Sequence, residues 1–106
     1  MDKIRLDMQG EFAEEFKLQR LADSDGARIN FVRLKAHRSL PAHNTNSNVR
    51  LLVLEGEITL TVADEEDSLG VCEMAGIAFD TPMQIRNLGD REAAFVVIEA
   101  PNAEGN

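Results

Sequence analysis

The feature that most constrains the fold is a series of short apolar segments that begins near Ala27 and is broken by turn residues every eight to twelve positions. Segments of this length, rich in Val, Ile, Leu and Phe, are typical of β-strands. Their spacing is typical of an all-β sandwich or barrel rather than of alternating strands and helices. Residues 49–54 are almost continuously apolar, which predicts a strand covered on both faces. Residues 58–63 alternate apolar and polar side chains, which predicts a strand with one buried face.

Turn residues between the other apolar runs set the remaining boundaries. Further strands are expected at residues 29–34, 68–74, 83–87 and 93–99, with an acidic hairpin tip at 64–67. Pro101 is expected to end the last strand and to leave residues 102–106 as a frayed tail. The chain is interpreted as one domain over residues 1–106, with an N-terminal extension over 1–26 and a barrel core over 27–101.

Two structures remain open for the N-terminal extension. Phe12 and Phe16 stand four residues apart, with acidic residues early and Lys17 and Arg20 late, as in a short amphipathic helix. The residues from Phe16 to Leu21 could equally form an edge strand.

Charge and cysteine content narrow the classes of partner and compartment. The formal charge of −8 at pH 7 disfavours binding to a phosphate backbone, so we expect no nucleic-acid partner. The basic residues from Arg28 to Arg38 are interpreted as a solvated strand face. The single cysteine, Cys72, cannot form an internal disulfide, and its apolar neighbours predict a buried structural thiol. We see no signal sequence or membrane span, and therefore expect a cytoplasmic protein without membrane contact.

One segment, LPAHNTNSNVRLLVLEGE at residues 40–57, carries a family resemblance. Pro41 and His43 stand where the first signature motif of small single-domain cupins has a proline and its first histidine, and Gly56 matches the closing glycine. Asn87 matches the asparagine of the second cupin motif. The chain therefore resembles the small RmlC-like cupins over most of its length. The resemblance implies an all-β fold, the cupin double-stranded β-helix or jelly-roll barrel, with a short N-terminal strand or helix extension.

The resemblance also implies a metal site that is largely missing. Metal-binding cupins use two histidines and a glutamate from the first motif and a histidine from the second. Here only His43 matches, while Thr45, Val49 and Met83 occupy the other positions. Thr is a poor ligand, Val is none, and the Met thioether suits soft ions such as Cu(I). Because a stable site needs three or more convergent ligands, we expect no metal and no other cofactor.

With these replacements the barrel interior becomes mostly apolar. Replacing buried charges that lack a metal avoids a desolvation cost of several kcal/mol per ion. Met74 and Met83 are expected to pack in the core, and Arg50 to lie near the rim of any cavity. A small-molecule site in the barrel would be lined by His43, Thr45, Val49, Met83 and Gln84.

Three functions remain open from the sequence. The leading hypothesis is a metal-free, non-enzymatic domain that binds or senses a small molecule, without an assigned catalytic residue. A divergent metal-dependent enzyme of the dioxygenase, isomerase or lyase kind could instead use His43 together with His37 or Asp80. A scaffold module with a filled barrel is the third. Small cupins usually pair sheet against sheet, so the resemblance also implies a homodimer.

Overall fold

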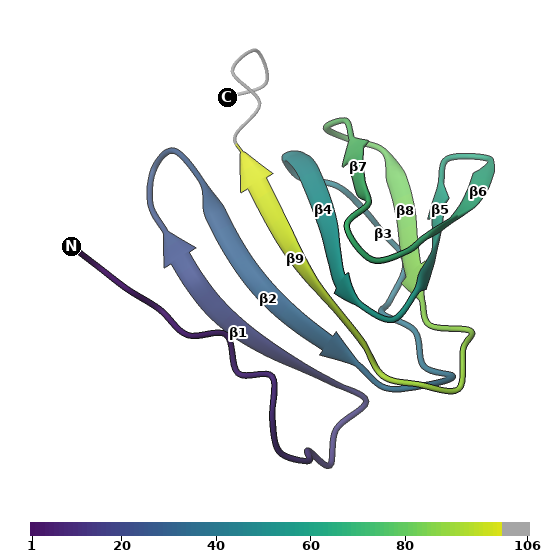
Figure 1. Cartoon of the computed structure of the whole chain (residues 1–106). Helices are drawn as coiled ribbons and strands as arrows, with labels where there is room; N and C mark the ends of the chain where they lie inside the picture. Colours follow the sequence, from purple (N-terminus) through teal and green to yellow (C-terminus); the bar gives the residue numbers. More distant parts are fainter. Residues whose placement is uncertain (101–106) are drawn as a thin grey trace.

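The computed structural model describes residues 1–100, which form nine β-strands in two antiparallel sheets (Figure 1). The five-stranded sheet has the order β1–β2–β9–β4–β7, with strands at Phe16–Asp23, Arg28–Leu34, Ala93–Ala100, Asn48–Glu55 and Met74–Ile77. The four-stranded sheet has the order β3–β8–β5–β6, with strands at His43–Asn44, Pro82–Arg86, Ile58–Val62 and Glu65–Leu69. Neighbouring strands are often distant in the sequence, as in jelly rolls. The predicted all-β architecture is confirmed.

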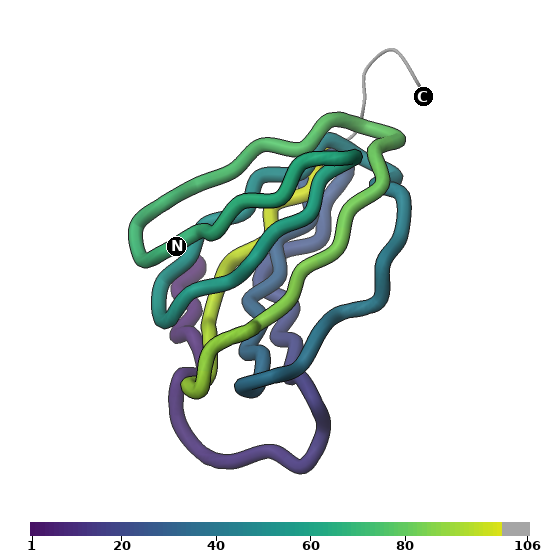
Figure 2. The backbone as a smooth tube through the Cα atoms, turned by 90° about the vertical axis from the view of Figure 1, so that its right-hand side faces the viewer, coloured from purple at the N-terminus to yellow at the C-terminus, as the bar shows by residue number. Residues whose placement is uncertain are grey.

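The two sheets face each other across one apolar core. Figure 2 looks onto the four-stranded sheet, with the five-stranded sheet behind it. In the five-stranded sheet, Val32, Phe95 and Val53 form one row across β2, β9 and β4, and all three side chains are buried. Ile58 and Leu60 are buried on the facing sheet, whereas the threonine that follows each of them is only half-buried, as their alternation predicts. Each such buried side chain contributes about 1.5–3 kcal/mol relative to exposure.

Most predicted strand boundaries agree with the structure, and the predictions for the C-terminal end concern residues outside the described part of the chain. The predicted strands at 29–34, 49–54, 83–87 and 93–99 correspond to β2, β4, β8 and β9 within one or two residues. The expectations for Pro101 and for residues 102–106 fall outside residues 1–100. No helix long and apolar enough to cross a membrane occurs within residues 1–100.

The N-terminal extension contains an edge strand, and the helix alternative is wrong. β1 pairs with β2 along its whole length, and residues 1–15 are not helical. The ring of Phe12 does not stack on a helical neighbour but lies 5.0 Å from the Arg33 guanidinium and 5.0 Å from the Lys35 ammonium. These cation–π contacts to a distant strand, rather than local helix pairs, determine where Phe12 lies.

Arg33 fastens the N-terminal segment to the sheet. Its guanidinium donates to the carbonyl oxygens of Gln9 and Gly10, both at 2.9 Å, and to Glu92 at 2.6 and 3.2 Å. The hydrogen bond to Glu92 raises the pKa of Arg33 above its ordinary value. The interpretation of the basic run as a solvated strand face is therefore wrong at Arg33, which is only 5% exposed. A carboxylate and two carbonyls there replace water around the charge.

The predicted strand at 68–74 is wrong, because a tight turn divides it. β6 ends at Leu69 and β7 begins at Met74, and the Glu73 carboxylate accepts a hydrogen bond from the Gly70 amide at 2.6 Å. Cys72 lies in this turn with a φ of +69° and is exposed, not buried as expected. Met74 is also exposed, at 54%, rather than packed in the core. The expected acidic hairpin tip is shorter than predicted, because residues 65–67 belong to β6.

Candidate functional site

The one matching ligand position of the cupin motif lies at an edge of the barrel. His43 belongs to β3, the edge strand of the four-stranded sheet, and its side chain is exposed. Its Nδ1 atom lies 3.3 Å from the carbonyl oxygen of Pro41. The register pairs His43 with Met83, so the two side chains share the core-facing side of the sheet. His43 is thus placed near the interior but makes its side-chain contact with its own loop.

Thr45 holds a loop in place. Its side chain is 3% exposed, and its hydroxyl donates to the carbonyl of Ala78 at 2.6 Å and accepts from the Thr81 amide at 3.0 Å. The backbone amide of Asp80 also donates to the Thr45 carbonyl. The only proton of the hydroxyl is used, so Thr45 has no hydrogen-bond donor left for a ligand.

The other two ligand positions are part of the hydrophobic core. Val49 on β4 and Met83 on β8 are each 5% exposed and belong to the same cluster as Leu51 and Ile85. These side chains fill the space where the family places a glutamate and a histidine. The barrel is closed by packing at these positions.

A shallow hollow of about 310 Å³ collects three of the five residues expected to bind a ligand. His43, Met83 and Gln84 line it, whereas Thr45 and Val49 do not. Gln84 pairs with Thr61 and follows Met83 by one residue, so both polar side chains point away from the core. Most of this hollow therefore lies on the outer side of the four-stranded sheet, and His43 and Met83 border it from the core-facing side.

The remaining candidate ligands do not converge. Within residues 1–100, no three His, Cys, Asp or Glu side chains are grouped so that they could hold a metal ion. His37 is exposed on a turn with a φ of +61°, as expected for a turn residue. The Asp80 carboxylate instead accepts a hydrogen bond from the Asn44 side chain at 3.2 Å. Arg50, expected near the rim of an internal cavity, lies on the outer face of the five-stranded sheet, because it neighbours core-facing Val49 and Leu51.

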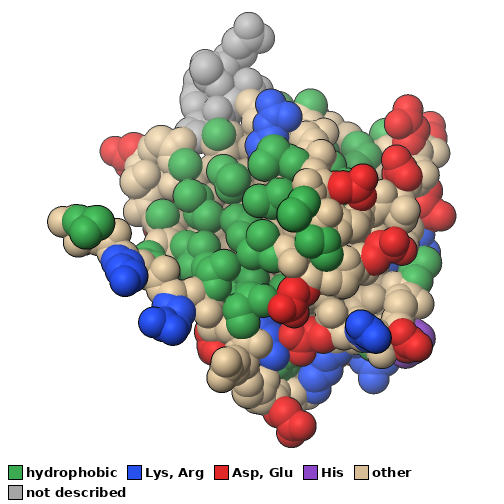
Figure 3. Space-filling model, viewed as in Figure 1, with side chains coloured by type: hydrophobic (Ala, Val, Ile, Leu, Met, Phe, Trp, Pro, Cys, Tyr) green, Lys and Arg blue, Asp and Glu red, His purple; other side chains and the backbone are tan. Residues whose placement is uncertain are grey.

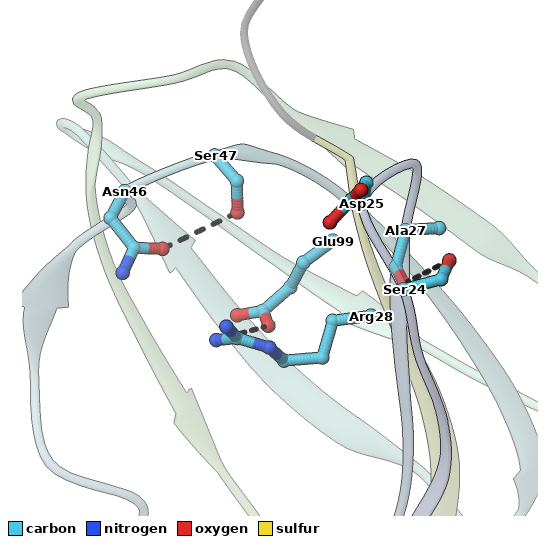
Figure 4. Close-up of a pocket in the computed structure, with 7 residues that line it drawn as sticks. All are labelled: Ser24, Asp25, Ala27, Arg28, Asn46, Ser47 and Glu99. Atoms are coloured by element: carbon cyan, nitrogen blue, oxygen red, sulfur yellow. Dashed lines mark hydrogen bonds and ion pairs between the residues drawn. The ribbon is translucent and has the colours of Figure 1, made fainter. Parts of the chain in front are cut away.

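A polar cavity that the sequence did not predict opens at one end of the barrel (Figure 4). Its volume is about 240 Å³, and it lies where β2 begins and β9 ends. Arg28 and Glu99 are register partners there, and Glu99 is also opposite Val49, so both charged side chains continue the core-facing row. The full lining is Ser24, Asp25, Ala27, Arg28, Asn46, Ser47 and Glu99. A charged pair at the open end of two apolar strands is the sequence signal that could have revealed it.

The outer face of the five-stranded sheet is unusually apolar. The register places Phe31, Val96, Leu52 and Met74 in one row across β2, β9, β4 and β7. The next row includes Ile29 and Ile98. We call these six residues the outer apolar face, and Figure 3 shows a broad group of hydrophobic side chains over these strands. Met74 is 54% exposed and four of the others are half-buried, whereas Phe31 is only 1% exposed and is covered within the chain itself. Solvated sheet faces normally carry polar side chains, so this surface is a candidate site of association.

Comparison with known proteins agrees with this fold. No family model matches the chain. An uncharacterized protein of Methanocaldococcus jannaschii is 29% identical over 96 residues, which cover 87% of this chain and 83% of that protein. Its crystal structure, described as an RmlC-like cupin with a double-stranded β-helix, has a TM-score of 0.78 at 27% identity and covers 90% of this chain and 91% of its own.

Two structures with lower sequence identity show the same fold. The Cnp3 cupin domain of Schizosaccharomyces pombe has a TM-score of 0.81 at 15% identity, covering 92% of this chain and 72% of that one. The cupin domain of an XRE family transcriptional regulator from Enterobacter cloacae has a TM-score of 0.73 at 18% identity, covering 84% of this chain and all of that one. The chain therefore has the double-stranded β-helix fold of the RmlC-like cupins and lacks most of the residues with which that fold binds metal.

Proposed function

We propose that this protein is a metal-free, non-enzymatic cupin whose filled barrel serves as an assembly module, and that it works as a homodimer joined through the outer apolar face. The observation that carries the proposal is the distribution of apolar side chains. Val49 and Met83 close the interior, where the family places ligands, while Val96, Leu52 and Met74 form an apolar row on the outer side of the sheet, where they are half-buried or exposed.

The interior favours packing over chemistry. An ionised carboxylate at Val49 without a metal would carry a desolvation cost of several kcal/mol, whereas the aliphatic side chain adds to the core. The hydroxyl of Thr45 is already bonded within the fold. A metal-dependent enzyme would need a ligand set that His43, His37 and Asp80 do not form in this structure. The scaffold alternative is therefore better supported than the enzyme.

The outer apolar face suits a second copy of the same chain. Each copy carries a formal charge of −8, so the net charges oppose association and burial of apolar surface has to drive it. A flat sheet face can pack on its own copy around a two-fold axis, with the sheets about 10 Å apart. Aligned sheets of this kind would also cover the half-buried side chains of Leu52, Val96 and Ile98.

Charges at the two ends of β4 fix the orientation we propose. Arg50 and Glu55 both lie on the outer side of the sheet, because Arg50 pairs with Ile98 and Glu55 with Ala94. Leu52, in the outer apolar face, lies between them. If the two-fold axis lies in the plane between the two sheets and is perpendicular to β4, the two β4 strands run antiparallel, and Arg50 of one copy lies near Glu55 of the other. Such rim charges contribute more to orientation than to affinity.

Sedimentation equilibrium tests this proposal. The wild-type protein should sediment as a dimer, and Val96→Glu, which introduces a charge at the centre of the face, should sediment as a folded monomer. Leu88→Glu is the matched control, because Leu88 is 57% exposed and lies on a loop outside the face. A wild-type monomer at all accessible concentrations would contradict the proposal.

Charge exchange tests the orientation separately. Arg50→Glu and Glu55→Arg should each weaken the dimer, and the double variant should recover much of the loss. Additive weakening in the double variant would mean that these two side chains do not meet across the axis.

A further inference from the structure

The polar cavity at the barrel end contains charged groups whose hydrogen-bonding capacity is unused. The Arg28 guanidinium lies 3.7 Å from Asp23 and 3.7 Å from Glu99. Both distances exceed the 2.7–2.9 Å typical of charge-assisted hydrogen bonds. Within the described residues, the Arg28 side chain makes no hydrogen bond, although a guanidinium has five N–H donors.

Arg33 is an example of a guanidinium whose N–H groups are bound by acceptors of the protein. Arg33 makes four hydrogen bonds, to Glu92 and to two backbone carbonyls. Arg28 instead borders an open space of about 240 Å³, with its side chain 48% exposed. The fold places the Arg28 charge between two carboxylates, but within the described residues no acceptor forms a hydrogen bond with its N–H groups.

The acidic groups of the cavity also have unused hydrogen-bonding capacity. The side-chain carboxylates of Glu99 and Asp25 accept no hydrogen bond within residues 1–100, and the Glu99 side chain is 25% exposed. Figure 4 shows Glu99 meeting Arg28, with Asp25 on the rim and Asn46 and Ser47 across the opening. The Ser47 hydroxyl donates to the side-chain Oδ1 of Asn46 at 3.3 Å, which leaves the side-chain NH₂ protons of Asn46 available. The cavity therefore offers unused donors and unused anionic acceptors side by side.

This combination selects ligands by charge. A simple anion would be attracted by Arg28 but repelled by Asp25 and Glu99, and a simple cation would meet the reverse. A molecule that carries an ammonium group and a carboxylate on the same carbon satisfies both sets. The volume is below the roughly 300–1,000 Å³ of sites for drug-sized ligands, so the molecule must be small.

We propose that this cavity binds a small zwitterion of the amino acid class. The ligand carboxylate accepts hydrogen bonds from Arg28, and its ammonium group donates to Glu99 and Asp25. Because Arg28 and Glu99 lie on the core-facing side of the sheet, the site is on the opposite side from the outer apolar face. Binding here does not depend on dimer formation.

Titration followed by amide chemical shifts tests the proposal with three matched probes. L-Alanine carries both charges, propionate lacks the ammonium group, and ethylamine lacks the carboxylate. L-Alanine should shift amides of residues 24–28 and 46–47 and bind at least about 10-fold more tightly than either analogue. Equal binding of propionate or ethylamine, or no L-alanine shift at millimolar concentration, would overturn the proposal.

Substitutions test the residues directly. Arg28→Gln and Glu99→Gln should each weaken L-alanine binding by roughly 10- to 100-fold, the effect of one charge-assisted hydrogen bond. Arg91→Gln and Glu57→Gln are the controls, because both residues are exposed and outside the cavity lining. Unchanged binding by Arg28→Gln would refute the site. If either cavity variant fails to fold, the comparison of the three probes on the wild-type protein decides alone.

Discussion

The ion pair between Arg33 and Glu92 gives the sharpest stability prediction. The Arg33 side chain is 7% exposed and that of Glu92 is 35% exposed, so their substitutions should have unequal effects. Glu92→Gln leaves a buried guanidinium without its anion, and we expect a loss of about 2 kcal/mol. That value lies between the ~0.2–1 kcal/mol of exposed pairs and the ~3–5 kcal/mol of breaking fully buried ones.

The reverse substitution should be milder. Arg33→Met places an apolar side chain in a buried position, and the freed groups (Glu92 and the carbonyls of Gln9 and Gly10) can be hydrated, because residues 9 and 10 are exposed. We expect a loss of about 1 kcal/mol for Arg33→Met, and about the same for the double variant. The coupling free energy is then about 2 kcal/mol.

Urea unfolding of the wild type, the two single variants and the double variant measures this cycle. A loss of 1 kcal/mol corresponds to roughly 4–8 °C in the unfolding temperature of a domain this small, so thermal melts give an independent check. Arg33→Lys is the control that keeps the charge but loses the planar fork of donors. A coupling below about 0.5 kcal/mol, or a larger loss for Arg33→Met than for Glu92→Gln, would refute the reasoning.

Three further predictions concern the barrel and its N-terminal segment. Thr45→Val removes both side-chain hydrogen bonds to the 78–81 loop and should cost about 1–3 kcal/mol in urea unfolding; an unchanged stability would mean that the hydroxyl is dispensable. Gly56→Ala adds a Cβ only 2.8 Å from the Glu92 carbonyl oxygen at a φ of +73°, and should cost roughly 2–4 kcal/mol; a melt within 2–3 °C of wild type (about 0.5 kcal/mol) would be incompatible with that contact. The hydrogen bond from Lys17 lowers the pKa of Asp7 below its ordinary 3.8, so its contribution is complete above that pH and is lost as the pH falls through the folded-state pKa. Carboxyl NMR titration should find the Asp7 pKa below 3.8, and a higher Asp7 pKa in Lys17→Met; a wild-type value at or above 3.8 would contradict the contact.

Most of the barrel could be predicted from periodicity, and the errors have physical causes. The runs that became β2, β4, β8 and β9 are apolar enough for strand length and spacing to decide their structure. The predicted strand at 68–74 failed because backbone and side-chain hydrogen bonds between Gly70 and Glu73 close a turn there, which apolar periodicity does not detect. The helix at the N-terminus failed because Phe12 is held by cationic side chains of a distant strand.

The candidate site was harder to predict than the fold. The loss of ligand chemistry at Thr45, Val49 and Met83 is visible in the sequence, but whether a cavity remains depends on packing between two sheets. The polar cavity combines the first residues of β2 with the last of β9, which lie about 70 positions apart in the sequence. Only the strand register brings Arg28 and Glu99 together.

The metal content of the purified protein tests the central claim most directly. If Val49 and Met83 close the barrel as core residues, elemental analysis of protein from metal-replete cells should find far less than one transition-metal ion per chain. A chelator should then leave the unfolding temperature unchanged, because there is no bound ion whose removal would destabilise the native state. About one iron, zinc, nickel or manganese per chain, together with a lower unfolding temperature after chelation, would contradict the account.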